Sequence, residues 1–207
     1  RGCRVDRGRV FIPRHVVEWA LKNVTAHRQM YAMRGSPAFV LGDGQIRFHN
    51  GGGPPFIYDL DSGQRRPALL QDVADMTRVL DALPNVDVVI PLFGAQDVPP
   101  ELMELAGTAT LLRNTRKPIS SGGVDKAEQG PYVTELAAAC CGGMDSFRSR
   151  PTLAISVSPV SPLTFTESVA GAIVAVARSG APFHSLPCPS LGATGPVAAT
   201  SAALLLA

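Results

Sequence analysis

A rigid polar turn follows each of the late apolar stretches of this chain and leads into a helical pattern. TLAISV at 152–157 is followed by SPVSP, and PFHSL at 182–186 is followed by a proline- and serine-rich turn at 187–196. A strand, a stiff turn and a helix that recur in this order are typical of parallel α/β folds. Such folds bind ligands at the carboxyl ends of their strands, where these turns lie. The repeat therefore predicts where a site lies before it indicates the chemistry.

The composition favours one globular domain, or a part of one. Hydrophobic residues make up 45% of the 207 residues, which is enough for a sizeable core. Lys and Arg number 19 against 17 Asp and Glu, for a net charge of +2. The basic residues are scattered along the sequence and form no basic stripe of the kind that binds nucleic acid, so we expect no nucleic-acid partner.

The cysteines indicate a reducing compartment, and the uncharged end of the chain is too interrupted for a membrane span. We therefore expect a cytoplasmic protein. Cys140 and Cys141 are adjacent, and Cys3 and Cys188 lie far from them, so neither a disulfide framework nor a zinc site is indicated. We expect buried free thiols in a reducing compartment and no bound metal. Residues 179–207 carry no Asp, Glu, Lys or Arg, but prolines divide them into pieces shorter than the roughly 20 residues of a membrane span.

The first third, 1–68, is predicted to be a loop-rich elaboration before a regular core. A helix with an apolar stripe begins after Pro13. FVLGDGQIRF at 39–48 is typical of a hairpin, because a tight-turn sequence separates its two alternating arms. The Gly- and Pro-rich segment 49–68 is predicted to be irregular.

The remainder, 69–207, is predicted to be a series of strands and helices. A helix over 69–83 ends at Pro84, and Gly142 and Gly180 end two later helices. We expect Asp97 and Ser161 to cap the helices that follow them. Strands are expected at 86–94, 117–123, 152–157 and 182–186, and a final helix at 195–207.

This series amounts to about four strand–helix repeats, which predicts a parallel sheet. A closed (β/α)8 barrel of the TIM type needs eight repeats, so 69–207 is expected to form about half of one. The apolar final helix requires a partner surface. We therefore expect the chain to be part of something longer, or the missing half to come from another copy.

No familiar catalytic motif is present. The chain lacks GxSxG, HExxH and P-loop patterns. The glycine run 51–53 lacks the GxGxxG spacing, so dinucleotide binding is only a weak interpretation.

Three polar residues, two at the end of the predicted hairpin and one within a predicted strand, have two interpretations each. His49 and Asn50 precede the glycine run, where they either contact a ligand or stabilise a turn. His184 lies within a predicted strand as a hydrogen-bonded core imidazole or as a ligand that lines a barrel. The sequence leaves these alternatives open.

A pair of arginines also has two interpretations. Arg65 and Arg66 could clamp a carboxylate of a ligand with two parallel hydrogen bonds. Pairing with nearby Asp59 or Asp61 is the alternative.

The stronger candidates are hydroxyls and stiff apolar residues at the predicted strand ends. Proline fixes φ and lacks a donor, so such residues make rigid walls with few polar groups. The alternative is that they only form turns and cap helices. The residues expected to face a substrate at one rim are Phe93, Ser120, Ser121, Ser158, Ser161, Pro187 and Pro189.

Taken together, the segments resemble the trimethylamine methyltransferase family. They occur in one order along essentially the whole chain, and the ordered set is more specific than any single motif. The segments are GCRVD at 2–6, FIPRHVV at 11–17, FHNGGGPPFIYDLDSGQRRPALLQDV at 48–73, DALPNVDVV at 81–89, QDVPPE at 96–101, NTRKPIS at 114–120, SPVSPL at 158–163 and PCPSLGATGPVAATSAAL at 187–204.

The resemblance implies a (β/α)8 barrel more than twice the length of this chain. It also implies a corrinoid-dependent methyltransferase that acts on a small methylated amine, either trimethylamine or a quaternary amine such as glycine betaine. The Co(I) corrinoid (cobalamin) would be presented by a separate carrier protein and not be bound tightly. We expect a homo-oligomer, and the resemblance identifies no catalytic residue. Phe93, Phe165 and Phe183 are the aromatic residues that this part could supply to a cation.

Two other readings remain open at this stage. One is a different barrel enzyme, such as a pterin-type methyltransferase or an aldolase. The other is a truncated, non-catalytic barrel fragment that acts at most as a binding surface for a corrinoid carrier.

Overall fold

The structure is a computed structural model that describes residues 2–25, 27–124, 126–160, 164–187, 190 and 192–195. The chain divides into a smaller unit, formed by Arg1–Arg28 and Val40–Gln45, and a larger unit, formed by Gln29–Phe39 and Ile46–Ala207. The predicted final helix at 195–207 lies almost entirely outside the described residues, as do Ser161 and Pro189.

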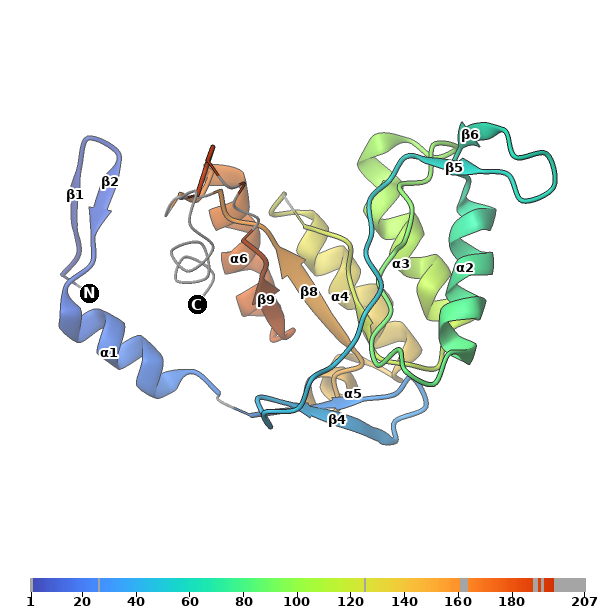
Figure 1. Cartoon of the computed structure of the whole chain (residues 1–207). Coiled ribbons are helices and arrows are strands. Elements are labelled where there is room, and N and C mark those ends of the chain that lie inside the picture. The colour runs from blue at the N-terminus through green and yellow to red at the C-terminus, as the bar shows by residue number, and fades with distance from the viewer. Residues whose placement is uncertain are drawn as a thin grey trace. The chain divides into compact units, whose positions relative to one another are not determined.

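The smaller unit contains a short hairpin and a helix (Figure 1). Strands β1 (Arg4–Asp6) and β2 (Arg9–Phe11) pair antiparallel. Arg7 and Gly8 join them with φ values of 48° and 76°, the two positive values that a tight hairpin turn uses. The predicted helix is confirmed as α1 (Arg14–Asn23), but none of its residues is buried, so its apolar stripe is uncovered in the part of the chain described.

Parallel strands in chain order form the centre of the larger unit. Strand β7 (Ile119–Ser120) pairs with β8 (Leu153–Val157), and β8 pairs with β9 (Phe183–Ser185), both parallel. Parallel bridges from Val89 to Ile119 and from His49 to Val88 add two more segments beside β7. The predicted mixed α/β fold with a parallel sheet is confirmed.

The helices of the larger unit follow one another in a single layer (Figure 1). Helix α2 packs against α3, α3 against α4, and α4 against α6. Gly142 and Gly180 adopt positive φ after α4 and α6, as the sequence predicted for helix ends. The helices are α2 (Leu70–Ala82), the 3-10 helix η1 (Pro100–Leu102), α3 (Met103–Asn114), α4 (Gln129–Cys140), α5 (Met144–Ser149) and α6 (Glu167–Ser179).

The hairpin predicted at 39–48 is wrong. Strand β4 (Pro37–Leu41) pairs instead with the preceding β3 (Arg28–Tyr31). The second predicted arm joins the parallel sheet, because the carbonyl of Phe48 accepts the N–H groups of Asp87 and Val88. Local alternation cannot distinguish these two partners for one segment.

A hairpin does occur in the segment that the sequence predicted to be irregular. Strands β5 (Phe56–Tyr58) and β6 (Arg65–Pro67) pair antiparallel. Gly63, with φ of 66°, lies in the loop between them. The prolines and glycines before β5 led the sequence analysis to predict an irregular segment, so this short pair of strands was missed.

The core lies between the sheet and the layer of helices. Strand residues and helix residues belong to one buried cluster, which includes Val89, Ile119, Leu153 and Ile155 from the sheet and Leu80, Leu111, Val133, Phe147 and Val176 from the helices. A smaller cluster of Met30, Phe39 and Ala154, with Val88 packed against it, covers the other face of the sheet. Side chains alternate between the faces of a strand, so the two clusters mark the two faces.

Helix ends are completed by residues of neighbouring repeats. The prediction that Asp97 caps the helix that follows it is wrong. Its Oδ1 accepts the N–H of Leu70 at 2.9 Å, at the start of the preceding helix α2. The N-cap of α6 is Thr166, whose Oγ1 accepts the N–H of Val169 at 3.2 Å. The sequence prediction placed this cap at Ser161, outside the described residues.

The carboxyl end of α2 is completed in the same way. Lys117 Nζ donates to the carbonyls of Leu80, at 2.8 Å, and Leu83. A cation at this end of a helix complements its dipole. Asp81 accepts from Arg116 N at 2.8 Å and from the Arg116 side chain at 2.9 and 3.0 Å. Arg116 and Lys117 thus have an internal structural role.

Gly52 lies where two parallel segments approach closely. A Cβ at this position would lie 2.6 Å from the carbonyl oxygen of Pro91. Gly53 N donates to the Leu92 carbonyl at 3.0 Å, which holds the segments together. The glycine run therefore serves close packing within the sheet.

We predict that Gly52→Ala destabilises the protein by about 1–3 kcal/mol, because the backbone must move to relieve the contact. Gly51→Ala is the matched control, since no atom lies within 4 Å of the Cβ it would add. Denaturant unfolding of both variants checks this. Equal stability of the two variants would contradict the close approach.

Candidate functional site

The face of the sheet turned away from the helices carries polar side chains. Ser120 pairs in register with Ala154, and Ser156 pairs with His184. His49 pairs with Val88, and residues paired in register point to the same face. Since Val88 and Ala154 belong to the small cluster, all these residues share its face. We call this the inner face, formed by His49, Val88, Ser120, Ala154, Ser156 and His184.

Ser120 and His184 form a hydrogen bond across the sheet. Ser120 Oγ lies 2.8 Å from His184 Nε2. Their strands lie on either side of β8, about 10 Å apart at the usual strand spacing. Ala154 and Ser156 of β8 are small, which leaves room for this contact. Ser120 is buried and His184 is exposed, so the pair is accessible from one side.

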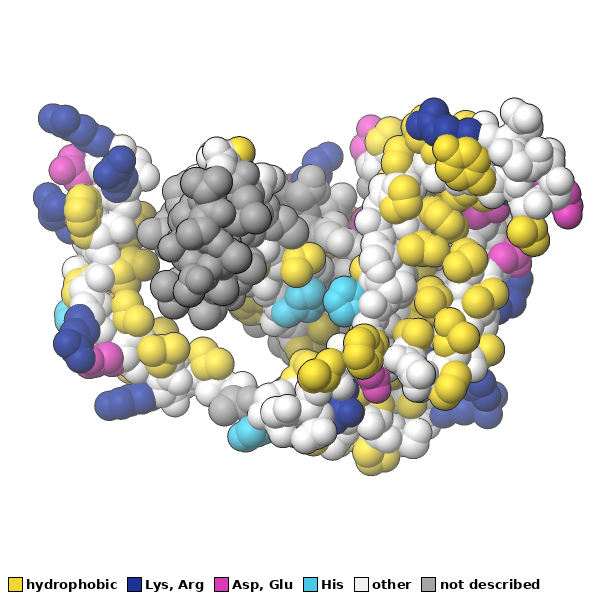
Figure 2. All heavy atoms as spheres, viewed as in Figure 1, with side chains coloured by type: hydrophobic (Ala, Val, Ile, Leu, Met, Phe, Trp, Pro, Cys, Tyr) yellow, Lys and Arg dark blue, Asp and Glu magenta, His cyan; other side chains and the backbone are white. Residues whose placement is uncertain are grey.

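The environment of His184 disfavours the charged form of its imidazole. Its pKa lies below the ordinary value, first because surrounding atoms withdraw water from the ring and second because His49 is a neighbour of like charge. Figure 2 shows histidine side chains beside one another in the middle of the visible surface of the larger unit. The two predicted histidines are therefore brought together.

Asn50 completes the sheet through its side-chain amide. Its Oδ1 accepts the N–H of Ile90 at 3.0 Å, and its Nδ2 donates to the Ile90 carbonyl at 2.9 Å. The side-chain amide thus replaces a backbone pairing. His49 Nδ1 lies 2.7 Å from the Asn50 carbonyl, and because a carbonyl only accepts, Nδ1 carries the hydrogen.

Ser121 also has a role within the sheet. Its hydroxyl accepts the N–H of Ser156 at 3.1 Å. The backbone bends away after β7, and Val124 N donates to the Ser156 carbonyl at 2.9 Å. Ser121 is buried, with 2% of its surface exposed.

Glu104, at the start of α3, holds the loop that follows β7. Its carboxylate accepts the N–H of Gly122 at 2.8 Å, the N–H of Gly123 at 3.2 Å and the hydroxyl of Thr108 at 3.1 Å. Bonds from backbone N–H groups to a carboxylate are charge-assisted. The loop beside Ser120 is thereby fixed from the helix layer. Sequence reasoning missed this residue.

Three further predicted rim residues, Phe93, Ser158 and Pro187, are not among the six that form the inner face. Phe93 is half-buried and packs against the main core. Ser158 is exposed after β8, and Pro187 is half-buried after β9. Ser161 and Pro189 lie outside the described residues. Their contact with a substrate stays a prediction.

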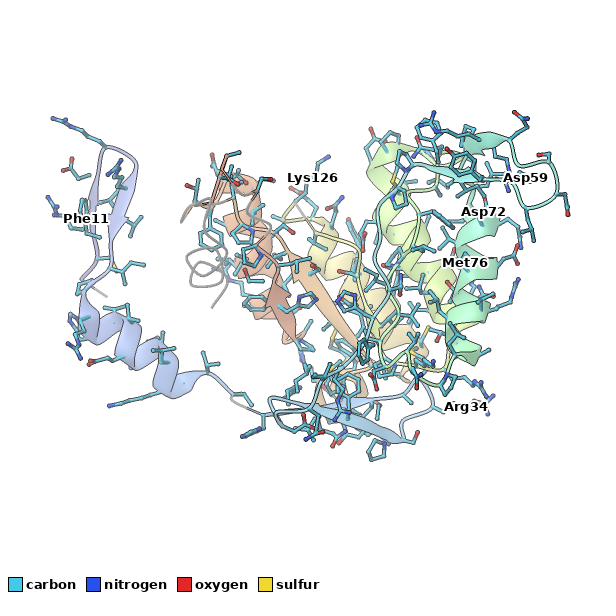
Figure 3. All side chains as sticks on the ribbon, viewed as in Figure 1. Phe11, Arg34, Asp59, Asp72, Met76 and Lys126 are labelled. Carbon is cyan, nitrogen blue, oxygen red and sulfur yellow. The ribbon has the colours of Figure 1, made fainter. Side chains whose placement is uncertain are left out.

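The predicted arginine clamp is used internally. Arg66 donates two hydrogen bonds to Asp72, at 2.7 and 2.9 Å, and one to Asp59 at 3.3 Å. Figure 3 shows both aspartates, Asp59 in the β5–β6 loop and Asp72 near the start of α2. Arg65 stacks on the ring of Phe56, 3.7 Å from its centroid. The ion-pair alternative from the sequence holds for Arg66.

The described cysteines are free thiols, as predicted, but they are not buried. Cys3 and Cys140 are exposed and Cys141 is half-buried. Partial desolvation raises the pKa of Cys140. Cys188 lies outside the described residues.

Within the described ranges, no group of three or more His, Cys, Asp or Glu side chains is placed to hold a metal ion. None of the helices described is long and apolar enough to cross a membrane.

Comparison with known proteins places the chain in a family named for a methyltransferase. The model of the family described as trimethylamine methyltransferase (MTTB) matches residues 1–207. The chain belongs to the trimethylamine methyltransferase family, as its motifs indicated.

Two curated relatives come from Desulfitobacterium hafniense. The glycine betaine methyltransferase of strain Y51 is 30% identical over 196 residues, which cover 94% of this chain and 40% of the relative. The trimethylamine methyltransferase MttB of strain DSM 10664 / DCB-2 is 30% identical over 198 residues, which cover 95% of this chain and 40% of the relative. The chain thus spans about 40% of the length of these relatives.

We predict that Glu104→Ala lowers the free energy of unfolding by about 1–3 kcal/mol, because the N–H groups of Gly122 and Gly123 and the hydroxyl of Thr108 lose a charged acceptor. Glu101→Ala is the control, since Glu101 is exposed one turn earlier. Chemical denaturation measures both. A Glu104 variant as stable as the Glu101 variant would contradict the role of this carboxylate.

Asp72 is predicted to stabilise the fold in a pH-dependent way. Hydrogen bonds from Arg66 are the main cause of its lowered pKa. Its contribution is therefore complete above the unfolded pKa of about 3.9 and is lost as the pH falls through the lower folded pKa. Asp72→Asn should lower the melting temperature at pH 7, and the difference from wild type should shrink toward about pH 2.

Asp61→Asn serves as the control for this measurement, because Asp61 forms no ion pair among the described residues. A difference for Asp72→Asn that stays constant with pH would mean that the charge of Asp72 is not what stabilises the fold.

Proposed function

We propose that the protein carrying this chain transfers a methyl group from a methylated amine to the Co(I) corrinoid of a separate carrier protein. Membership of the trimethylamine methyltransferase family supports this proposal. The two relatives are named for different substrates, glycine betaine and trimethylamine, at the same 30% identity. The names therefore leave the amine open.

The proposed fold of the whole protein is a (β/α)8 barrel. The single observation that carries the proposal is that five parallel segments follow one another in chain order with their helices in one layer. A barrel needs this arrangement, whereas a doubly wound sheet has helices on both faces. In a barrel the inner face would line the interior, near the carboxyl ends where active sites lie.

For a quaternary amine, the transfer needs a site that orients the substrate more than one that donates a proton. Trimethylamine would react as its trimethylammonium ion, whose N–H bond stays intact while dimethylamine leaves neutral. When a quaternary amine loses a methyl group, the C–N electron pair stays on nitrogen and the amine leaves neutral. The methyl carbon forms its new bond with the electron pair of Co(I). The six residues of the inner face include no carboxylic acid, which agrees with a step that requires no general acid. Their proposed role is to position the substrate.

The test is to mix the whole protein with a Co(I) carrier protein and, separately, glycine betaine, trimethylamine and tetramethylammonium. We expect methylcobalamin absorbance to appear with at least one amine. Absence of methyl transfer from all three would count against the proposed reaction.

Ser120→Ala connects this activity to the inner face. We expect kcat/KM to fall about 3- to 10-fold, because His184 loses a neutral hydrogen bond that orients its ring. Ser149→Ala, an exposed serine at the end of α5, should leave the rate unchanged. Equal rates for the two variants would remove Ser120 from the proposed site.

A further inference from the structure

The hairpin formed by β5 and β6 presents large hydrophobic side chains to solvent. Leu60, at its tip, is 98% exposed, the largest exposed fraction of any large hydrophobic residue in the described part of the chain. Tyr58 is 75% exposed, and Phe56 is exposed as well. In Figure 2, hydrophobic and basic side chains lie beside one another over this hairpin. Large hydrophobic side chains that gather on a surface are typical of an interaction site.

The two faces of the hairpin have different environments. Phe56 and Tyr58 lie on one face, and Arg65 pairs in register with Tyr58 on the same face. Arg66 lies on the opposite face, where two hydrogen bonds join it to Asp72 of α2. One face thus attaches the hairpin to the helix layer. The other face, formed by Phe56, Tyr58 and Arg65, is exposed, and we call it the outer face.

The outer face has the composition of a protein interface. The guanidinium of Arg65 stacks on the ring of Phe56, 3.7 Å from its centroid. Tyrosine, phenylalanine and arginine are enriched where proteins bind one another. Membranes and nucleic acids are bound by clusters of Lys and Arg, whereas the outer face has one guanidinium and the adjoining loop carries the acidic Asp61. The outer face therefore fits a protein partner.

The loop at the tip of the hairpin is held by its own hydrogen bonds. Asp59 Oδ1 accepts the N–H of Ser62 at 3.0 Å and the hydroxyl of Ser62 at 2.9 Å. Asp59 N donates to the Gln64 carbonyl, and Gly63 N donates to the Asp59 carbonyl, both at 2.9 Å. These bonds fix the backbone on both sides of Leu60. A surface that is fixed beforehand loses little conformational freedom when a partner binds.

The hairpin lies at the carboxyl end of the parallel sheet. The chain passes from the segment that contains His49 directly into β5, and Gly94 N still donates to the Pro54 carbonyl at 3.1 Å just before the hairpin begins. Figure 1 shows β5 and β6 beyond the start of α2. In the proposed reaction the methyl carbon must meet the Co(I) of the carrier protein. The carrier must therefore approach the sheet from this end.

We infer that the outer face and Leu60 form a docking surface for the carrier protein. This inference rests on the proposed function and names the surface through which its protein partner is held. The partner surface is expected to be apolar, with a carboxylate that meets Arg65. Tyr58 and Leu60 are docking residues that do not touch the methyl donor.

The test uses the whole protein with the double substitution Tyr58→Ala and Leu60→Ala. Both side chains are exposed, so the variant should fold, and its melting temperature checks this. Val174→Ala, at an exposed hydrophobic residue of α6, is the matched control. Calorimetry measures binding of the carrier protein loaded with hydroxocobalamin. Methyl transfer is measured with the Co(I) carrier and, separately, with free Co(I) cobalamin as the acceptor.

We expect the double variant to bind the carrier at least about 10-fold more weakly than wild type, with a matching rise in the KM for the carrier. The kcat at saturating carrier and the rate with free cobalamin should stay within about 2-fold, because the docking surface does not contact the reacting atoms. Arg65→Glu should also weaken carrier binding, and more at low salt than at high salt. Val174→Ala should change none of these values.

Unchanged carrier affinity in the folded double variant would overturn the inference, as would a wild type that binds no carrier. Equal losses with the carrier and with free cobalamin would also overturn it, since the hairpin would then belong to the reacting site. A changed molecular mass in light scattering with unchanged carrier affinity would identify a second copy of the chain as the occupant and overturn it.

The inference and the proposed function fail in different ways. Carrier binding that depends on the hairpin, without methyl transfer from any amine, would uphold the docking surface and reject the proposed function. Methyl transfer to a carrier whose affinity is the same for wild type and the double variant would reject the docking surface and leave the proposed function intact.

Discussion

The alternation of side chains along β8 is the constraint on which the larger unit depends. All five of its residues are buried, so each of its two faces must be covered. Leu153 and Ile155 pack against the helices, whereas Ala154 belongs to the small cluster on the other face. Because the period of a strand is two, any shift by one residue would exchange these environments. The same register that builds the core therefore puts Ser156 on the inner face.

Features of the fold that depend on local chemistry could be predicted from the sequence. Proline after α2 and glycines after α4 and α6 mark helix ends through their own backbone preferences. The predictions that were wrong concern residues whose hydrogen-bond partners are distant in the sequence. Phe48 bonds to residues 87 and 88, and Asp97 bonds to Leu70, 27 residues earlier. Alternation and capping rules identify a residue able to make such a bond but not the partner that it meets.

The candidate site shows the same division. Ser120 and His184 were identified one at a time, but their contact joins residues 64 positions apart across an intervening strand. It requires the register of both pairings and the small side chains of β8, which no single segment encodes. Polar residues near strand ends were harder to assign. Ser121 and Asn50 look like ligand-binding residues in sequence, yet both replace backbone partners where the ladder ends.

The shared helix ends have a consequence for how such a sheet can diverge. Asp97 accepts a hydrogen bond from the first residue of helix α2, and Lys117 donates one to a carbonyl near its end. Both residues belong to repeats that come after this helix. A strand–helix repeat of this chain is consequently not a self-contained module. Recombination that imported one repeat from a relative would leave its neighbours with open backbone groups. Substitutions at the inner face touch none of these connections, so they leave the helix ends intact.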